Sequence, residues 1–265
     1  MRIATWNVNS VRPRLPRLLG WLERAKPDVL CLQETKCATE AFPAAEVAEL
    51  GYDIAAHGTG RWNGVAILSR VGFADVTRGL TDEPGYLADG ALFETTEPRA
   101  IGATCDGVRV WSVYVPNGRE PSHPHYEYKL RWLEALRATA VAELADARPF
   151  AVLGDFNVAP TDDDVWDVSR FAESTHVTEP ERTALAALRE AGLTDVFPRA
   201  LKHDHPYTYW DYRQLAFPNN NGMRIDLVYG NPAFTTAVTD CYVDRDERKG
   251  TGVSDHAPVV ADLAV

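Results

Sequence analysis

The sequence has few cysteines, and their arrangement suggests neither a metal site nor a disulfide framework. Cys31, Cys37, Cys105 and Cys241 are the four cysteines, and none is paired at the close spacing of zinc-binding motifs. Cys31 and Cys105 lie in apolar runs typical of strands, so we expect reduced thiols in the core. This cysteine use is typical of a cytoplasmic protein.

Long apolar runs, linkers and low-complexity tracts are also absent from the sequence. No run approaches the length of a membrane span, and the first residues, 1–7, have the pattern of a strand rather than of a signal peptide. No Ser/Gly-rich linker or charge block marks a boundary between domains. We therefore expect a cytoplasmic protein with no membrane association and one domain over residues 1–265.

An excess of positive charge is the third missing feature. The formal net charge is −11 and the isoelectric point is about 5.1, which argues against a cationic coat for non-specific nucleic-acid binding. Nucleic acid stays open as a partner, because carboxylates that surround a divalent cation are neutralised where a phosphate binds. Basic residues form local clusters at Arg12/Arg14/Arg17, Arg119, Lys129/Arg131 and Arg245/Arg248/Lys249. Charge alone leaves the partner undecided.

The most informative stretch runs from Ala151 to Asn157. Its apolar first half predicts a buried strand that is too short for a helix, and Gly154 ends the run directly before Asp155. Side chains two apart on an extended backbone point the same way, so Asp155 and Asn157 would face a ligand together at the strand end. Gly-Asp-x-Asn is equally typical of an ordinary turn, and this stretch alone does not decide between the two.

Hydrophobic periodicity divides the chain into strand-rich halves separated by helices. Helices are expected at 11–26, 43–51, 126–147 and 179–192, the last one opened by a capping box at Thr178. Strands are expected at 2–6, 28–32, 52–56, 64–69, 90–95, 100–104, 108–114, 151–153, 207–210, 223–229, 238–243 and 257–263. This order predicts an α/β fold in which two packed β-sheets are flanked by helices, a four-layer sandwich.

The two halves of the chain resemble each other. Residues 26–34, which end at Glu34, parallel residues 148–155, which end at Asp155. The segments 6–9 and 156–159 are also similar. We therefore expect internal pseudo-symmetry, with two half-folds that face each other and each give an acid and an amide to one cleft.

Five clusters of polar residues follow or interrupt the predicted strands. They are Asn7/Asn9, Glu34, Asp155/Asn157, Arg224-Ile225-Asp226 and Ser254-Asp255-His256. Most have an ordinary interpretation: Asn as a turn residue, Glu34 beside Lys36 as a solvated charge, and His256 as a turn cap. Asp226 differs, because a carboxylate inside an apolar strand is costly unless it is paired.

Taken together, the clusters favour metal-assisted chemistry. Oxygen ligands from Asn, Glu and Asp suit a hard cation such as Mg²⁺ or Mn²⁺, and no cluster of Cys or His indicates zinc. A histidine oriented by a carboxylate supplies proton transfer or stabilises charge in the transition state. These are the parts needed for hydrolysis of a phosphate ester.

The order of the motifs carries a family resemblance over essentially the whole chain. The motifs are Trp6-Asn7-Val8-Asn9, Leu32-Gln33-Glu34-Thr35-Lys36, the segment 154–161, Arg224-Ile225-Asp226-Leu227 and Ser254-Asp255-His256-Ala257-Pro258. They resemble those of the exonuclease III family of AP endonucleases, within the endonuclease/exonuclease/phosphatase superfamily. The assignment to the exonuclease III branch rests on the segment 207–213 leading into 222–226.

The resemblance implies a metal site. Glu34, with Asn7 and Asp255, would hold Mg²⁺ on the scissile phosphate, and Mn²⁺ would substitute for it. Further candidate ligands are Asp155 and Asn157, for a second ion, and His256.

The resemblance also implies catalytic roles. Asp155 would activate the attacking water, and Asn157 would orient that water or a phosphate oxygen. His256, oriented by Asp226, would stabilise charge on the phosphate. Tyr114 matches the active-site tyrosine of the family, although on its own it would be interpreted as an ordinary strand residue.

Contacts to DNA are implied as well. Trp210 and residues 217–223 match the region that lines the pocket for the abasic sugar, and core packing is the alternative for Trp210. The expected phosphate contacts are Asn9, Lys36, Asn117, Arg119 and Arg224. The loop 117–125 departs from the usual form of the family.

The activity implied by the resemblance is that of a monomeric, Mg²⁺-dependent AP endonuclease of base-excision repair. It would act on double-stranded DNA with abasic sites or blocked 3′ ends, cleaving 5′ to the abasic site, with 3′→5′ exonuclease and 3′-phosphatase activity besides. Two alternatives are a superfamily phosphatase or phosphodiesterase for small phosphoesters and a non-catalytic binder of damaged DNA.

Overall fold

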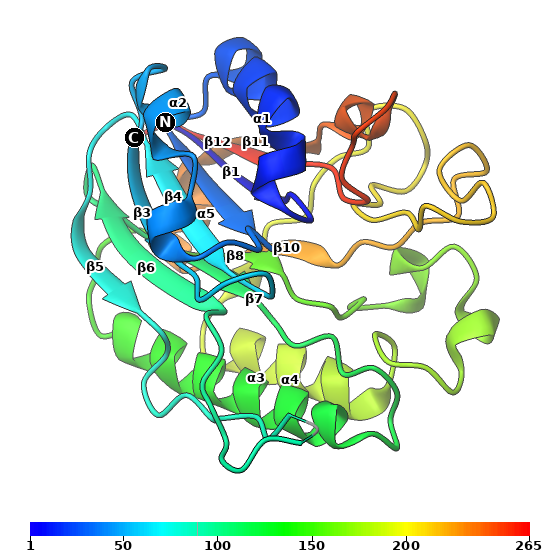
Figure 1. The fold of residues 1–265 in the computed structure, drawn as a ribbon. Helices are drawn as coiled ribbons and strands as arrows, with labels where there is room; N and C mark the ends of the chain where they lie inside the picture. The colour runs from blue at the N-terminus through cyan, green and yellow to red at the C-terminus, as the bar shows by residue number, and fades with distance from the viewer. Residues whose placement is uncertain (89) are drawn as a thin grey trace.

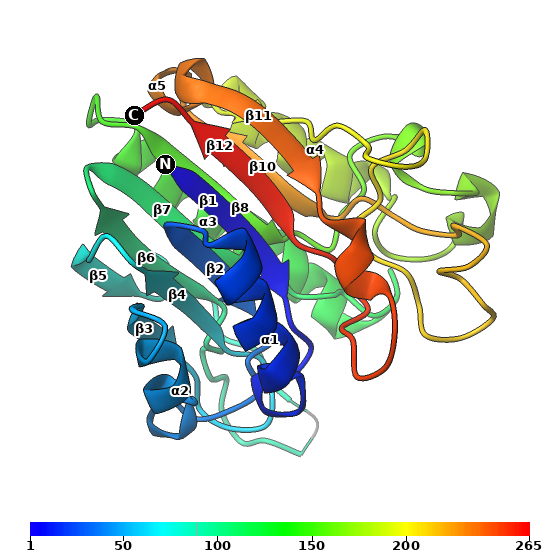
Figure 2. The same cartoon turned by 90° about the horizontal axis from the view of Figure 1, so that it is seen from above.

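The first of two β-sheets contains both ends of the chain. The computed structural model describes residues 1–88 and 90–265, and its first sheet has the order β11-β12-β1-β2-β4-β3 (Figures 1 and 2). Its strands are β1 (Arg2–Asn7), β2 (Val29–Gln33), β3 (Asp53–His57), β4 (Val65–Ser69), β11 (Val238–Val243) and β12 (Val259–Leu263). The amide of Leu263 donates to the carbonyl of Met1, which places the two termini side by side.

The second sheet has the order β5-β6-β7-β8-β10-β9. Its strands are β5 (Ala74–Arg78), β6 (Ala100–Cys105), β7 (Val108–Tyr114), β8 (Phe150–Asp155), β9 (Thr194–Asp195) and β10 (Asp226–Gly230). Both sheets have six strands, and they pack face to face.

Helices cover the outer faces of the two sheets. In Figure 1, α1 (Val11–Ala25) and α2 (Ala44–Ala48) lie on the side of the first sheet, and α3 (Pro124–Glu143) and α4 (Glu179–Glu190) on the side of the second. The short α5 (Pro232–Ala237) follows β10. The predicted four-layer α/β sandwich is confirmed. Among the described residues, no helix has the length and apolar character needed to cross a membrane.

Each sheet contains one parallel pair of strands joined by a helix. β1 and β2 are parallel and connected through α1, and β7 and β8 are parallel and connected through α3. In such a unit both strands end at the same edge of the sheet. The remaining strands follow in matching order, so β2 corresponds to β8, as the similarity of 26–34 to 148–155 predicted. The second similarity was misleading: β1 corresponds to β7, not to β8, which makes Tyr114 the counterpart of Asn7.

Alternate residues of the central strands pack into different cores. Ile3 of β1 and Leu153 of β8 face the opposite sheet, whereas Ala4 and Val152 face the helices outside. A strand that is buried on both faces has a continuous apolar sequence, which is why 151–153 could be recognised as a strand.

The inner layer becomes polar toward the edge where the parallel strands end. The side chain of Gln33 donates to Thr5 Oγ1 (2.9 Å) and to Ser112 Oγ (3.0 Å), which joins the two sheets by hydrogen bonds. All three side chains are fully buried. Farther along β1 and β7, the same inward-facing rows reach Asn7 and Tyr114.

Some predicted strands differ from the structure. Residues 90–95 form no strand in the part of the chain that the structure describes, and only Thr95 pairs, with Tyr86. β5 was missed because it is a largely exposed edge strand without an apolar pattern. Residues 207–210 and the first part of 223–229 pair only through isolated bridges.

The packing of β8 against β7 leaves no room for a side chain at Gly154, and this can be tested. A Cβ atom there would lie 1.9 Å from the carbonyl oxygen of Val113 in the neighbouring strand β7, so the two backbones would have to separate. We expect Gly154→Ala to lower the free energy of unfolding by at least ~1–3 kcal/mol. Gly20→Ala in α1, where a Cβ meets open space, is the control and is expected to raise it by about 0.5–1 kcal/mol. Urea unfolding of the two variants measures both changes, and equal stability would contradict the expectation.

Candidate active site

Acidic and amide side chains from both sheets meet at the polar edge of the sandwich. Asn7 ends β1, Glu34 directly follows β2, and Asp155 ends β8. Asp226 begins β10, which is antiparallel to β8 and pairs with it so that Asp226 lies opposite Asp155. His256 precedes β12, which is antiparallel to β1. Strand direction and register therefore place all five residues at one edge.

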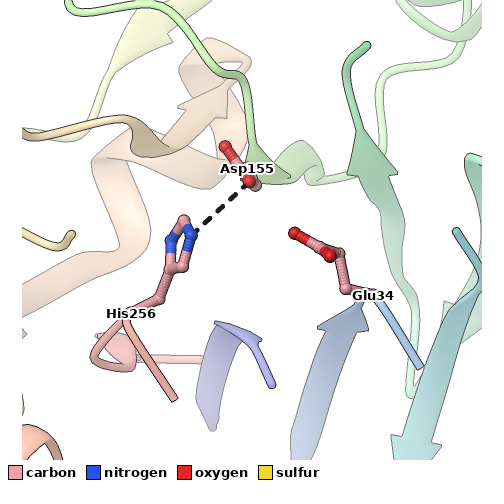
Figure 3. Close-up of side chains that lie close together, drawn as sticks. All are labelled: Glu34, Asp155 and His256. Carbon is pink, nitrogen blue, oxygen red and sulfur yellow. Dashed lines mark ion pairs between the residues drawn. The ribbon is translucent and has the colours of Figure 1, made fainter. Parts of the chain in front are cut away.

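Glu34, Asp155 and His256 form a compact set of candidate metal ligands. One ligand atom from each lies within 4.8 Å of the others, and Figure 3 shows the three side chains directed toward a common centre. No other group of three or more His, Cys, Asp or Glu residues with this geometry occurs in residues 1–88 and 90–265. The two carboxylates of Glu34 and Asp155 suit a hard cation such as Mg²⁺ or Mn²⁺, so the fit to the predicted ion rests on them, whereas His256 would be a ligand only as the neutral imidazole.

Asn7 fixes the two carboxylates of this cluster. Its Nδ2 donates to Glu34 Oε1 and to Asp155 Oδ2, both at 2.9 Å. Its Oδ1 accepts from the amide of Asn9 (2.9 Å), so the oxygen is turned away from the carboxylates. Asn7 was expected to offer that oxygen to the metal, and in this structure it instead bridges the two sheets through its amide nitrogen.

Lys36 and Asn9 connect Glu34 to Asp255. Lys36 Nζ lies 2.7 Å from Glu34 Oε2 and donates to Asn9 Oδ1 (2.6 Å), and Asn9 Nδ2 donates to Asp255 Oδ1 (3.0 Å). Burial raises the pKa of Glu34, but Lys36 outweighs this effect and the pKa is lowered overall. Asp255, an expected metal ligand, lies outside the three-residue cluster. Asn9 and Lys36 are half-buried beside the carboxylates, and their contacts to DNA stay predictions.

His256 lies between two carboxylates. Its Nδ1 lies 2.7 Å from Asp226 Oδ2, and its Nε2 lies 3.8 Å from Asp155 Oδ2. Burial opposes the charged form, but Asp226 and Asp155 together raise the pKa of His256 to about 10. The raised pKa favours the protonated imidazole, whose Nε2 is on the side of Asp155 while Nδ1 contacts Asp226.

The pKa of Asp155 is raised to about 7 in the metal-free protein. Burial is the main cause, and the Asp226 and Glu34 carboxylates add to it, while His256 partly opposes it. A carboxyl group with a pKa near neutrality is well matched to taking up and releasing a proton.

Asn157 is held in an unusual backbone conformation beside Asp155. Its φ of +50° lies in the left-handed region, and its amide donates to Asp155 Oδ1 (2.9 Å). Its side chain donates to the carbonyl of Val115 (2.9 Å) and accepts from Asn117 Nδ2 (3.2 Å). Asn117 thus contacts the site through Asn157, whereas Arg119 is exposed in the loop that follows.

Tyr114 completes the cluster from the end of β7. Burial raises the pKa of its phenol well above the ordinary range, and the nearby Glu34 carboxylate adds to the effect. The guanidinium of Arg99 lies 4.7 Å from the centre of its ring. The phenol is therefore neutral.

A pocket of about 420 Å³ adjoins this cluster. Tyr209 is shared by both, because its ring lies 5.0 Å from that of His256. The other lining residues are Trp166, Arg170, Phe171, His176, Asp211, Arg213, Gln214, Ala216, Asn221 and Met223. Aromatic and apolar side chains thus share the lining with polar and charged ones, a mixture that suits a ligand with both apolar and polar parts.

Comparisons with known proteins agree with this geometry. A family model described as the endonuclease/exonuclease/phosphatase family matches residues 4–256. The chain belongs to this family. A DNA repair nuclease, APEX1, of Danio rerio is 31% identical over 272 residues, which covers 100% of this chain and 83% of the relative.

Two solved structures of the family are similar over their whole length. The 3′ phosphatase NExo from Neisseria, bound to a product DNA hairpin, is 37% identical with a TM-score of 0.92 and 100% of both chains covered. An AP endonuclease from Archaeoglobus fulgidus is 34% identical with a TM-score of 0.90 and the same coverage.

Two residues expected to contact DNA are placed elsewhere in this family member. Trp210 is fully buried in the core between the sheets, because adjacent residues of an extended segment point to opposite sides and Tyr209 takes the pocket side. Arg224 is 2% exposed and pairs with Asp164 (2.6 Å) and Asp195 (2.9 Å). The predictions for Trp210 and Arg224 are therefore wrong.

Sequence reasoning missed three polar residues behind the site, of which Lys129 and Glu181 are fully buried and His176 is half-buried. His176 lines the pocket and contacts the carbonyl of Asn157 through Nδ1. Lys129, which the sequence placed in a basic cluster, is fully buried and pairs with Glu181. The capping box at Thr178 pointed to Glu181, but only as a helix cap.

The position of His256 between carboxylates predicts a measurable shift. In metal-free protein, Asp226→Asn is expected to lower the pKa of His256 from about 10 toward or below 6.5. Burial lowers this pKa, and without the Asp226 carboxylate less negative charge remains to raise it. NMR titration of the histidine ring measures this pKa, with exposed Asp163→Asn as the control. Because the folded pKa is raised, the pair stabilises the fold fully below pH 6.5 and loses this effect as the pH rises through about 10. An unchanged pKa in Asp226→Asn would contradict the assignment.

Proposed function

We propose that this hydrolytic nuclease is a Mg²⁺-dependent AP endonuclease of base-excision repair, acting as a cytoplasmic monomer. It would hydrolyse the phosphodiester 5′ to an abasic site in double-stranded DNA and also act on blocked 3′ ends. The observation that carries the proposal is the cluster of Glu34, Asp155 and His256, with ligand atoms within 4.8 Å of one another, beside a pocket of about 420 Å³. The names of the similar proteins, a DNA repair nuclease, a 3′ phosphatase and an AP endonuclease, support it.

Glu34 and Asp155 would hold the metal ion, which supplies positive charge to the phosphate when bound. The remaining chemistry falls to the side chains. Asp155 accepts a proton from the attacking water. Asn157, whose backbone amide donates to Asp155, orients that water. The protonated His256 directs Nε2 at the phosphate and stabilises the charge that develops on its oxygens.

In the reaction, water attacks phosphorus in line with the bond to the 3′ oxygen of the preceding nucleotide. That bond breaks, the 3′ oxygen takes a proton from solvent, and Asp155 releases the proton it accepted to solvent, so that the products are a 3′-hydroxyl and a 5′-deoxyribose phosphate. The pocket lined by Tyr209, Trp166 and Met223 would receive the abasic sugar. A nucleotide that carries a base would need both unstacking and more room.

A direct test uses 5′-labelled duplex DNA with one abasic site. We expect cleavage at the 5′ side of the site in Mg²⁺, loss of cleavage in chelator, and little cleavage of an intact duplex. An inositol phosphate in parallel tests the alternative of a phosphatase for small phosphoesters. Faster hydrolysis of the inositol phosphate than of abasic DNA would overturn the proposal.

Asp155→Asn is expected to lower kcat by at least ~10²-fold and to leave DNA affinity near that of the wild type, because the proton acceptor is lost. Single-turnover cleavage and filter binding measure the two quantities. Asp163→Asn is the matched control, because Asp163 is an exposed carboxylate in the loop that follows. Undiminished cleavage by Asp155→Asn would reject the role of Asp155.

Glu34→Gln is expected to raise the Mg²⁺ concentration needed for half-maximal activity by about tenfold or more, because a neutral amide binds a hard cation less strongly. A Mg²⁺ titration of the cleavage rate measures the change. Exposed Glu40→Gln is the control and should keep the wild-type curve. The same curve for Glu34→Gln and wild type would show that Glu34 is not a ligand.

A further inference from the structure

Lys129, on the second turn of α3, has no part in the mechanism above, yet its side chain is fully buried. Its Nζ donates to the backbone carbonyls of Asn157 (2.7 Å) and Asn117 (3.2 Å) and to the hydroxyl of Thr175 (3.1 Å). Its ion-pair partner is Glu181, which is equally buried. The ammonium group is thus surrounded by acceptors.

Stability alone gives little reason for this arrangement. Taking two charges out of water is expensive, and apolar residues of similar size often replace a buried ion pair without loss of stability. Glu181 already has a structural role, because Oε2 accepts from the amide (3.0 Å) and hydroxyl (2.7 Å) of Thr178 and so caps α4. Lys129 has no comparable role in its own helix. Its contacts are all to segments outside α3.

Those segments are the exits of the two strands that carry the site. α3 connects the parallel strands β7 and β8, so it begins at the edge where both end. β7 ends at Tyr114 and leads to Asn117, and β8 ends at Asp155 and leads to Asn157. A side chain from the second turn of the connecting helix can therefore reach both exits, and Lys129 cross-links them.

Asn157 depends on support of this kind. Its left-handed backbone conformation costs asparagine less than most residues other than glycine, but it is still disfavoured, and contacts with the surroundings select it. The amide and side chain of Asn157 are fixed by Asp155, Val115 and Asn117. Lys129 and His176 fix its carbonyl.

We propose that Lys129 is a positioning residue for the nuclease reaction. It holds Asn157 and Asn117 so that Asn157 stays aligned with Asp155, and Glu181 supplies the charge that allows a lysine to be buried there. The effect on rate rests on the proposed function, because it acts through the Asp155 centre.

The double variant Lys129→Met/Glu181→Gln tests the proposal. It removes both charges together, so that neither remains buried without a partner, and it removes the donors to the two carbonyls. The control is Arg109→Met/Glu143→Gln, which removes a second ion pair (2.8 Å) between buried Arg109 of β7 and half-buried Glu143, the last residue of α3. Both double variants are assayed at a temperature where circular dichroism shows them folded.

We expect the Lys129 variant to lower kcat on abasic DNA by about 10- to 100-fold, as small misplacements of catalytic groups do, with KM changed less than about threefold. The Arg109 variant should keep kcat within about twofold of wild type at a similar loss of stability. Glycine permits the left-handed backbone at position 157. When the Lys129→Met/Glu181→Gln double variant is made in an Asn157→Gly background, we therefore expect it to lower kcat by less than about threefold relative to Asn157→Gly alone. The proposal would be overturned if the folded Lys129 variant has the kcat of the wild type. It would also be overturned if the loss of kcat caused by the Lys129 variant is as large in the Asn157→Gly background as in the wild type.

A structural readout separates this inference from the proposed function. Crystal structures of wild type and the Lys129 variant should differ at Asn157, which leaves the left-handed region or loses its contact to Asn117. Unmoved Asn157 and Asn117 would refute the positioning role, whereas a wild type that cleaves no abasic DNA would refute the function.

If the double variant does not fold, the single variants decide. Glu181→Gln keeps the lysine donors and should retain at least about fivefold more kcat than Lys129→Met, and equal loss would refute the role.

Discussion

Crowding of buried carboxylates is the constraint on which this structure depends. Glu34, Asp155 and Asp226 lie at one edge of the sandwich, where the last two are almost entirely buried. Like charges at such distances cannot all stay ionised without nearby cations, and the raised pKa of Asp155 reflects this. His256 and Lys36 supply part of the positive charge, and a hard cation between Glu34 and Asp155 would supply the rest. The repulsion that makes the site costly to build also makes it a place for a metal ion and a proton.

The two sheets make the crowding unavoidable. Each contains one helix-linked parallel pair, so β1, β2, β7 and β8 all end at the same edge. The inward-facing rows are apolar along most of their length and become polar only there. Just before the site, Gln33 hydrogen-bonds to Thr5 and, across the sheets, to Ser112. Neutral polar side chains therefore separate the apolar core from the charged residues of the site. Asn7 continues this bridge, because its amide nitrogen holds Glu34 from its own sheet and Asp155 from the other.

Buried ion pairs outside the cluster hold the loops that surround it. Arg224 fixes the loop around Asp164 to β9 through Asp195, and Lys129 with Glu181 ties α3 and α4 to the loops after β7 and β8. Arg224 lies in one of the family motifs, and its buried ion pairs account for it without a contact to substrate. Removing one partner of such a pair leaves an uncompensated buried charge, so the loss of either partner is expected to destabilise these loops strongly.

The sequence by itself determined the layers and the helix-linked strands and pointed to the acids at their ends, because continuous apolar runs and strand-end carboxylates are local patterns; it did not show that Asp255 lies outside the cluster of Glu34, Asp155 and His256. It could not show that Tyr209 rather than Trp210 faces the pocket, since a shift of one residue along an extended segment exchanges its two sides. It could not show that Arg224 and Lys129 are buried, because burial of a cation depends on partners such as Asp164 and Glu181, which are distant in sequence. Only the tertiary structure decided these points, because they depend on which segments meet.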